Sequence, residues 1–560
     1  MTLVHTRSVQ ETVGAVGRPR LRTDATTVAL HWGIALLLVA SLATGFRIAA
    51  DAEDATLSRW LSPILPQGEV TRWHGWFAGG LIVLAATYVA FLVSARLTPR
   101  IALDGSRLRA LSARDHRTRW QSINVLVYWI AFAALALVGT TGALLYLEIP
   151  VAPHGLVTTA HRVGAWVLVA YVVLHVAAQA AMGGGVQLLK ILRPRAAYGF
   201  PALVGALLGM AAAAGVAAVD RGRPQTLAVA AVPAAPRLDG DPNDAAWAAA
   251  WPVVIETVRG ANFPGGSVAV TVRAVHDQTH AYFLFQWPDA TRSQKHLPLH
   301  KTEAGWQILE TDYARQDEDA YYEDKFAVML ARSPVLAGAG TSHLGGKPLA
   351  DKPAPSGGRG LHFTSDGSYV DVWHWKSVRT GPMGQIDDNH FGPPLAPPAK
   401  PGDRYTGGYT QDPHTGGGFI QNWRKLADGT VQPLHLPRDP GVLRRLGPID
   451  LDPSLGDKGD WWLPRDLTVP YSAELDAEYP IGTVLPSVVI DAPFEGDRGD
   501  VRAAGRWLDG RWHLEVSRRL DTGSAFDTPI ADGIFLWVAA FDHSQTRHSQ
   551  HLHPVRLSLR

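Results

Sequence analysis

The sequence contains no cysteine among its 560 residues. This absence excludes structural disulfides, thiolate zinc sites, cysteine-ligated iron–sulfur clusters and covalently attached c-type haem, which needs a Cys-x-x-Cys-His motif. Any redox centre must therefore use His, Met, Lys or carboxylate ligands. The charges also balance, with 52 Lys and Arg against 51 Asp and Glu, which argues against a nucleic-acid binder driven by overall charge.

Charge is missing locally from five long stretches near the N-terminus. The stretches without Asp, Glu, Lys or Arg are 28–46, 73–95, 120–147, 163–189 and 196–219. Because about 20 apolar residues span a bilayer, we predict five transmembrane helices. The boundaries that follow are a tail over 1–23, a four-helix domain over 24–195, a fifth helix and linker over 196–224, and a soluble region over 225–560.

Arginine and lysine gather in alternate loops between these stretches. The rich segments hold Arg18, Arg20, Arg22, Arg96, Arg100, Arg107, Arg109, Arg114, Arg117, Arg119, Lys190, Arg193 and Arg195. The positive-inside rule then places the N-terminus in the cytoplasm and the region after about residue 220 outside. We expect a bacterial inner membrane, with the outside region in the periplasm. A competing interpretation makes 28–46 a cleaved signal peptide, although its uncharged run is longer than a usual signal core.

Four histidines lie in or beside the apolar stretches, where polar groups are costly. His31 and His175 fall in the cytoplasmic half, and His74 and His161 fall in the outer half. His161 and His175 are fourteen positions apart, which places them about 21 Å apart along one helix and within roughly 40° of the same face. Two pairs of neutral imidazoles at two depths are what two bis-His b-type haems need.

These histidines could also have purely structural roles. Each could be an interfacial side chain at a helix end, or could hydrogen-bond between helices. A proton relay is disfavoured because the uncharged stretches contain no Asp or Glu. Nearby glycines, including Gly45 and Gly142, would let flat macrocycles lie close to the backbone.

The N-terminal region resembles a known family. Ala29-Leu30-His31-Trp32, His74 at the start of the second stretch, and the His161–His175 spacing are similar to the bacterial cytochrome b561 family and to the b-type subunits of hydrogenases and formate dehydrogenases. The resemblance covers about 24–195. It implies that His31, His175, His74 and His161 are the axial iron ligands of two haems b, and that the protein exchanges electrons with membrane quinone or quinol.

From about residue 225 the apolar pattern changes to period two, which indicates strands. The segments are 268–272, 281–285, 326–330, 369–373, 512–516 and 534–538. With no long amphipathic helix between them, we predict an all-β sandwich behind an all-α transmembrane bundle. Gly and Pro are dense over 381–418, which predicts a long loop outside the core, within an insertion over about 377–485.

Short phrases in this region resemble the haem-binding domain of the ethylbenzene dehydrogenase gamma subunit. They are Leu238-Asp239-Gly240 with Trp247, Phe283–Trp287 with Pro288-Asp289, Asp324–Val328, Asp371–Lys376, Trp512–Arg518, Phe535–Asp542 and Val555–Leu559. The resemblance covers about 235–376 and 500–560.

In that family one b-type haem is held by a Met and by a Lys in a Lys-Ser motif. This chain has Leu361-His362-Phe363 near the first position and His548-Ser549 at the second. The resemblance therefore implies bis-His ligation of a third haem iron by His362 and His548. Alternative ligands are His551, His553, His374, Lys376, Met329 and Met383, and the tail histidines could instead be a polar surface edge.

These features favour an electron-transfer cytochrome of a respiratory chain over a stand-alone catalyst, since we find no constellation of catalytic residues. Its partners would be the lipid bilayer, the quinone pool and a periplasmic redox protein or enzyme, with no nucleic acid; the sequence leaves a homodimer open. One alternative is a terminal reductase of a small oxidant or ferric chelate at the outer haem. Another is a non-redox, membrane-anchored binding module.

Overall fold

The computed structural model describes residues 24–49, 60–61, 64–66, 70–149, 151–192, 197, 199–221, 225–310, 318–334, 363–364, 367–396, 406–447 and 449–560. Contacts divide the chain into two units, and the division crosses the long helices. We therefore describe three parts one at a time. They are the His31 half of the helices (24–37, 80–133 and 167–214), the His74 half (38–79 and 134–166) and the β region (225–560).

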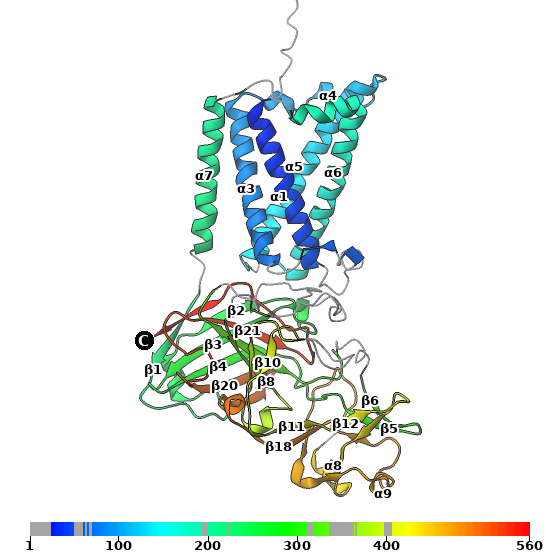
Figure 1. Cartoon of the computed structure of the whole chain (residues 1–560), viewed down its shortest axis with the longest axis vertical. Coiled ribbons are helices and arrows are strands. Elements are labelled where there is room, and N and C mark those ends of the chain that lie inside the picture. Colours follow the sequence, from blue (N-terminus) through cyan, green and yellow to red (C-terminus); the bar gives the residue numbers. More distant parts are fainter. Residues whose placement is uncertain are drawn as a thin grey trace, which may run out of the picture. The chain divides into compact units, whose positions relative to one another are not determined.

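Five helices in the described part of the chain are long and apolar enough to cross a membrane, as the sequence predicts. They are α1 (Ala25–Ala49), α3 (Val70–Ser94), α5 (His116–Tyr146), α6 (His154–Leu189) and α7 (Gly199–Arg221), coloured blue to green in Figure 1. Many outward side chains are apolar, among them Leu36, Val39, Val89 and Val93. Such a surface suits lipid, in which a helix satisfies its own backbone hydrogen bonds.

Two of these helices start earlier than the uncharged stretches suggest. The helix α6 begins at His154, so His161 lies two turns inside it, and α3 begins at Val70, one turn before His74. Both histidines therefore sit on regular helix, where their direction is set by the helix and not by a loop.

The β region is built on one sheet of twelve strands, in the order β10-β9-β8-β7-β21-β22-β1-β3-β4-β20-β19, with β2 also paired to β3. The strands are β1 (Thr226–Ala231), β2 (Val253–Thr257), β3 (Val268–His276), β4 (His280–Pro288), β7 (Lys325–Ala331), β8 (Val370–Lys376), β9 (Asp387–Phe391), β10 (Tyr409–Gln411), β19 (Arg502–Leu508), β20 (Arg511–Arg519), β21 (Phe535–Phe541) and β22 (Val555–Leu559). All six predicted strands lie in this sheet. Among its described strand pairs, only those of β1 with β22 and with β3 are parallel.

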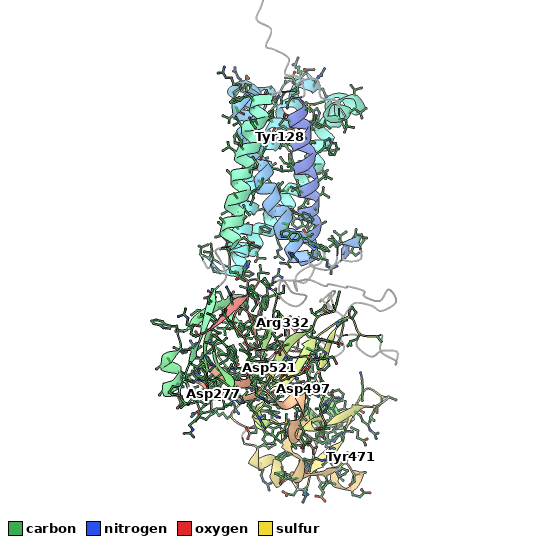
Figure 2. The ribbon with its side chains drawn as sticks, turned by 60° about the vertical axis from the view of Figure 1, so that its left-hand side comes forward. Tyr128, Asp277, Arg332, Tyr471, Asp497 and Asp521 are labelled. Carbon is green, nitrogen blue, oxygen red and sulfur yellow. The ribbon has the colours of Figure 1, made fainter. Side chains whose placement is uncertain are left out.

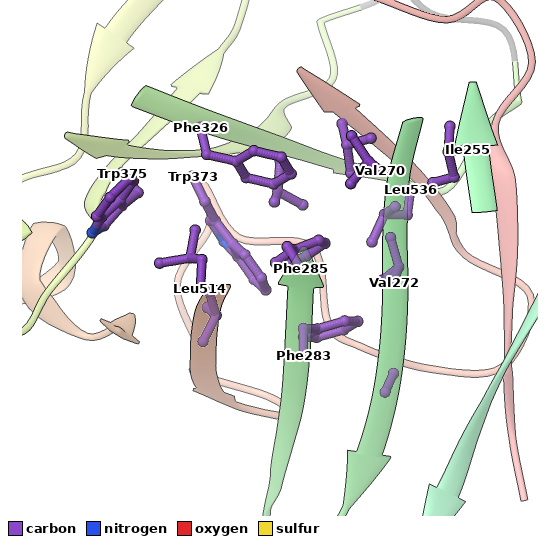
Figure 3. Packing of buried hydrophobic residues seen from close by; sticks show 14 of the residues in the cluster. Ile255, Val270, Val272, Phe283, Phe285, Phe326, Trp373, Trp375, Leu514 and Leu536 are labelled. Atoms are coloured by element: carbon purple, nitrogen blue, oxygen red, sulfur yellow. The ribbon is translucent and has the colours of Figure 1, made fainter. Parts of the chain in front are cut away.

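The sheet curls until its two ends meet around one core. Phe283 and Trp287 of β4 pack on Trp373 and Trp375 of β8, with ring centres 5.8 Å and 6.4 Å apart, although β4 and β8 are far apart in the strand order (Figure 3). At Gly505 of β19 a Cβ would stand 2.3 Å from the Trp375 ring, so only glycine fits there. The β-rich fold is thus confirmed, and its facing layers come from a single sheet.

Residues predicted as a loop outside the core are partly buried. The segment 385–391 is buried throughout, and β9 pairs with β8 over Asp387–Phe391. The expectation fails because this strand reads Asp387-Asp388-Asn389-His390 and carries no apolar pattern. Its Asp387 is buried against two basic side chains from other elements, Lys376 of β8 and Arg498, whose Nε donates to the Asp387 carboxylate at 2.5 Å.

Smaller sheets cover residues 299–308 and 416–495. Their strands are β5 (Leu299–Thr302), β6 (Gly305–Ile308), β11 (Gly416–Gln421), β12 (Trp423–Lys425), β13 (Val431–Pro433), β14 (His435–Pro437), β15 (Leu463–Pro464), β16 (Thr468–Pro470), β17 (Val484–Leu485) and β18 (Val488–Glu495), with short helices α8 (Gly441–Arg445) and α9 (Ala473–Asp476). They enclose a second core that includes Trp306, Trp423 and Leu463.

Candidate functional site

The His31 half of the helices brings two of the predicted histidines face to face. His31 of α1 and His175 of α6 have ring centres 6.2 Å apart. Nδ1 of His175 lies 3.2 Å from Oδ1 of Asn124 on α5, an oxygen that also accepts from Gln179 at 3.2 Å. Since an amide oxygen only accepts, Nδ1 of His175 is the donor, and its Nε2 keeps a lone pair.

Tyrosines enclose the same ring. The centre of the His175 imidazole lies 5.4 Å from that of Tyr128 and 5.5 Å from that of Tyr171, the latter stacked. Figure 2 labels Tyr128 among the helices. These rings pack against the imidazole and limit its rotation.

The His74 half repeats the arrangement with the other two histidines. His74 of α3 and His161 of α6 have ring centres 6.3 Å apart. Nδ1 of His74 donates to the carbonyl oxygen of Ser41 at 3.0 Å and also lies 3.0 Å from Oγ1 of Thr44. Nδ1 of His161 lies 3.0 Å from Oγ1 of Thr141. Each threonine hydroxyl donates to the carbonyl four residues earlier, Ala40 or Leu137, so it accepts from the imidazole.

A Thr-Gly pair therefore holds each ring of the His74 half. A Cβ on Gly45 would stand 3.1 Å from Cε1 of His74, and a Cβ on Gly142 would stand 3.1 Å from Cε1 of His161. We expected these glycines to leave room for a macrocycle, but in the structure they make room for the histidine itself. The signal that sequence reasoning missed is the repeated Thr-Gly dipeptide in the first and third spans.

The spacing of both pairs fits an iron with two imidazole ligands. An imidazole nitrogen binds a first-row metal at about 2 Å, and the ring centre lies about 1 Å behind it, so two rings on opposite sides of one ion have centres about 6 Å apart. The observed separations are 6.2 Å and 6.3 Å. Three of the four rings also engage Nδ1, which is the usual second contact of a metal-binding histidine.

In the β region, one face of β7, β8 and β21 turns away from the large core. His374 of β8, Ala327 of β7 and Ala539 of β21 follow one another in a single row across these strands. All three are half-buried, while the flanking positions Met329 and Lys325 are buried. Both small side chains lie on the β7 side of His374, and Asp387 of β9 lies on its other side.

His374 is available as a ligand on this surface. Its Nε2 is buried and has no hydrogen-bond partner among the described residues. Burial, together with the positive charges of Lys376 and Lys325, holds the pKa of His374 well below its usual range. The ring is therefore neutral, as metal ligation requires.

His548 reaches the same neighbourhood. Its ring centre lies 5.0 Å from that of Phe541, which in turn stacks on His374 at 5.3 Å. Nδ1 of His548 donates to the Ser549 carbonyl at 2.8 Å, so Nε2 is the nitrogen that carries the lone pair for a ligand bond. The other implied ligand, His362, lies outside the described residues.

The other candidate ligands of the third haem differ in whether their nitrogen or sulfur atoms already make contacts within the fold. Both nitrogens of His551 are engaged, Nε2 by the Val538 amide at 2.9 Å and Nδ1 by the His553 carbonyl at 2.7 Å. Lys376 pairs with Asp387, and burial lowers its pKa to about 8. Met329 lies on the same face one row from His374, whereas Met383 packs in a separate cluster with Trp461.

Comparisons with known proteins match the helices and the β region to two different families. Residues 22–193 match the family described as prokaryotic cytochrome b561, and residues 244–552 match the family described as ethylbenzene dehydrogenase. No curated protein is significantly similar to the chain.

Among solved structures, a family 9 carbohydrate-binding module from Caldicellulosiruptor kristjanssonii in complex with cellotriose is 10% identical, covering 60% of this chain and 95% of that chain at a TM-score of 0.21. The same module in complex with glucose is 10% identical, covering 60% and 97% at a TM-score of 0.22. TM-scores of this size establish neither a shared fold nor a shared ligand.

The second family match extends over more than half of the chain. The first covers the helices that pair the four histidines. The protein therefore belongs to the ethylbenzene dehydrogenase family, and its N-terminal part is a membrane b-type cytochrome of the b561 family.

Proposed function

We propose that this protein carries electrons across a membrane through two b-type haems, one between His31 and His175 and one between His74 and His161. The observation that supports this most directly is the pair of imidazole–imidazole separations, 6.2 Å and 6.3 Å. Haem iron bound at these positions supplies reversible one-electron transfer. The chain itself supplies neutral ligands, a fixed ring direction and a dry surrounding.

The residues around each ring have separate tasks in this proposal. Asn124, Thr44 and Thr141 hold the proton on Nδ1, so that Nε2 faces the space between the rings. Gly45 and Gly142 let the His74 and His161 rings approach their neighbouring helices. Tyr128 and Tyr171 pack against His175 and limit its rotation.

A third haem on the face of β7, β8 and β21 extends the proposal to the β region. His548 and His362 are its ligands by the family pattern, and His374 is the nearby histidine whose Nε2 lacks a partner among the described residues. Ala327 beside His374, and Ala539 next to Ala327 on the following strand, would give a flat ring system a surface of small side chains to lie on.

The route would run between the quinone pool and a periplasmic redox partner. The arginine-rich loops support a cytoplasmic N-terminus and a periplasmic β region in an inner membrane. A reporter fused after residue 560 that is active only in the periplasm tests this placement. Activity of this fusion supports a periplasmic β region. Inactivity of this fusion, together with activity of a second fusion whose reporter works only in the cytoplasm, contradicts it.

The haem content of the purified full chain tests the assignment. We expect a reduced b-type spectrum and close to three haems per chain by pyridine haemochrome. His161→Ala and His175→Ala should each remove one membrane haem. His548→Ala and His374→Ala separate the two candidates in the β region, with His300→Ala on β5 as a control that keeps all haems. A chain without haem would overturn the proposed function.

A further inference from the structure

Three carboxylates from distant parts of the β region meet at one point. Asp371 of β8, Asp388 of β9 and Asp527, in the loop between β20 and β21, each offer an oxygen within 4.8 Å of the other two. Asp371 and Asp388 are 0% exposed. Buried acids without matching cations are rare, because burial of a bare charge is costly.

A second group of acids continues the first toward solvent. Asp497, Asp500 and Asp527 also offer oxygens within 4.8 Å of one another, so that Asp527 belongs to both groups. Asp497 lies on the short helix η9 (Asp497–Gly499) and is labelled in Figure 2. These three acids are half-buried, so they form the open side of a site that Asp371 and Asp388 close.

Positive charge on the protein does not balance these acids. Arg518 of β20 pairs with Asp371 and lies 3.8 Å from Asp527. Lys376 and Arg498 pair instead with Asp387. Five carboxylates therefore share one guanidinium among the described neighbours.

Several oxygens in the cluster also lack any hydrogen-bond donor. Within the described residues, no donor reaches Oδ1 of Asp371, Oδ2 of Asp388, Oδ1 of Asp500 or Oδ1 of Asp527, and all four atoms are buried. In two of these carboxylates the other oxygen is held by a hydrogen bond. Oδ1 of Asp388 accepts from the backbone N–H of Asn389 at 3.0 Å, and Oδ2 of Asp527 accepts from the Thr522 hydroxyl at 2.6 Å. Buried oxygens that are held in place without a donor point to a bound ligand or a bound proton.

A hard divalent cation accounts for both the excess charge and the missing donors. Calcium takes six to eight oxygen ligands at about 2.4 Å, so two oxygens on opposite sides of it lie up to about 4.8 Å apart. The ligand set contains oxygen alone, which disfavours zinc and copper. We propose that Asp371, Asp388, Asp500 and Asp527 bind a calcium ion, with Asp497 at the rim.

Such an ion would join segments that the chain keeps far apart. It would tie β8 and β9, at one end of the curled sheet, to η9 and the 521–530 loop, which flank β19 and β20 at the other end. The strand β8 carries His374 on its opposite face. Calcium would therefore fix the strand that supports the proposed third haem, although the inference does not rest on that haem.

Without an ion, the cluster would have to hold protons instead. Burial raises the pKa of Asp371 to about 7, and burial with the charge of Asp527 raises the pKa of Asp500 to about 7. A bound ion and bound protons lead to different predictions for added calcium, which stabilises the folded chain only if it binds there.

The test uses the full chain in detergent, freed of divalent ions with a chelator. Millimolar calcium should raise the unfolding temperature of the β region by about 5 °C, and magnesium should raise it less. Asp388→Asn should abolish the calcium shift while unfolding at or above the wild-type temperature in chelator, because it removes a repelling charge. Asp521→Asn, an exposed acid of the same loop, should keep the shift.

Three results would overturn the proposal. They are no calcium binding by the wild-type chain in equilibrium dialysis, the same calcium shift in Asp388→Asn as in wild type, and a magnesium shift as large as that of calcium. None of these three measurements depends on the number of haems bound. The proposed function and the calcium proposal can therefore fail separately.

Discussion

The helices and the β region treat their buried polar groups in opposite ways. In the helices, three of the paired histidines direct Nδ1 to a hydroxyl, a carbonyl or an amide of a neighbouring helix. The β region instead buries full charges, such as Arg518 with Asp371 and Lys376 with Asp387. Charged side chains are costly and rare in lipid-embedded helices, and α1 buries one of them, Arg47. The curled sheet can supply partners for buried charges from several strands.

The histidines also differ in how many ring nitrogens the fold uses. His551 uses both nitrogens inside the fold. His74, His161 and His175 use Nδ1 and keep Nε2. The proposed function requires this second pattern, in which Nε2 remains for a ligand bond.

The largest effect should come from filling the glycine beside His161. Gly142→Val would drive a methyl group into the imidazole, whose Cε1 stands 3.1 Å from the site of a Cβ. We expect the loss of one haem per chain, measured by haemochrome. Gly139→Val, on the same helix with nothing within 4 Å of its Cβ site, is the matched control and should keep its haems. Equal losses in both variants would show that the effect is on the helix alone.

Breaking a buried pair should weaken the β region next most strongly. Arg518→Met leaves Asp371 without its cation, and loss of one partner of a buried pair costs about 3–5 kcal/mol. Denaturant unfolding followed by tryptophan fluorescence measures the change. Arg519→Met, the exposed neighbour, should change stability by less than about 0.5 kcal/mol. A similar small change in Arg518→Met would contradict our view of the charge network.

Removal of a hydroxyl contact should have an intermediate effect in the helices. Thr141→Val keeps the side-chain shape but takes away the acceptor for Nδ1 of His161. Loss of such an outer contact typically weakens a metal site about 10- to 100-fold. Haem retention during competition with an apo-haemoprotein measures this. Thr140→Val, one residue away, serves as the control, and equal retention in the two variants would argue against a role for the hydroxyl.

The smallest effect concerns the pH dependence of the β region. Burial, and then the charge of Asp542, raises the pKa of Asp289 to about 8, and burial with Asp289 and Asp542 raises that of Asp324. These folded-state values exceed the unfolded ones, so the folded state takes up a proton below about pH 8. Stability should therefore rise as the pH falls from 8 toward 5.

Asp289→Asn removes part of this uptake. Over the same pH range, the unfolding temperature of the variant should rise less than that of wild type. The reason is that one proton-binding carboxyl is gone and Asp324 has one negative neighbour fewer. The pair of His543 with Asp542 is left in place. Asp521→Asn should keep the wild-type slope. An unchanged slope in Asp289→Asn would mean that this carboxyl stays ionised.

Much of this architecture could be predicted from the sequence because it rests on apolar periodicity. Five uncharged stretches and six alternating segments became five helices and strands of one sheet. The pairing of the four histidines followed from their depth along the helices. Register and depth are local properties, and the sequence carries them directly.

The rest depended on partners that are distant in sequence. Nothing in Asp387-Asp388-Asn389-His390 indicates a buried strand, because the bases that pair with Asp387 come from other parts of the chain. Thr44 and Thr141 are ordinary helix residues until the helices pack and a histidine reaches each hydroxyl. The curl of the sheet likewise requires the meeting of Gly505 with Trp375, far along the chain.

The Thr-Gly pairs also have a consequence for coupling between electrons and protons. Among the described residues, the Nδ1–H of His74 meets the Thr44 hydroxyl and the Ser41 carbonyl, and neither group is a base that takes up a proton near neutral pH. The protonation of this ring would stay the same whichever oxidation state the neighbouring metal adopts. We therefore expect a midpoint potential at the His74–His161 level that is nearly flat against pH, so that current through this level builds no proton gradient by itself.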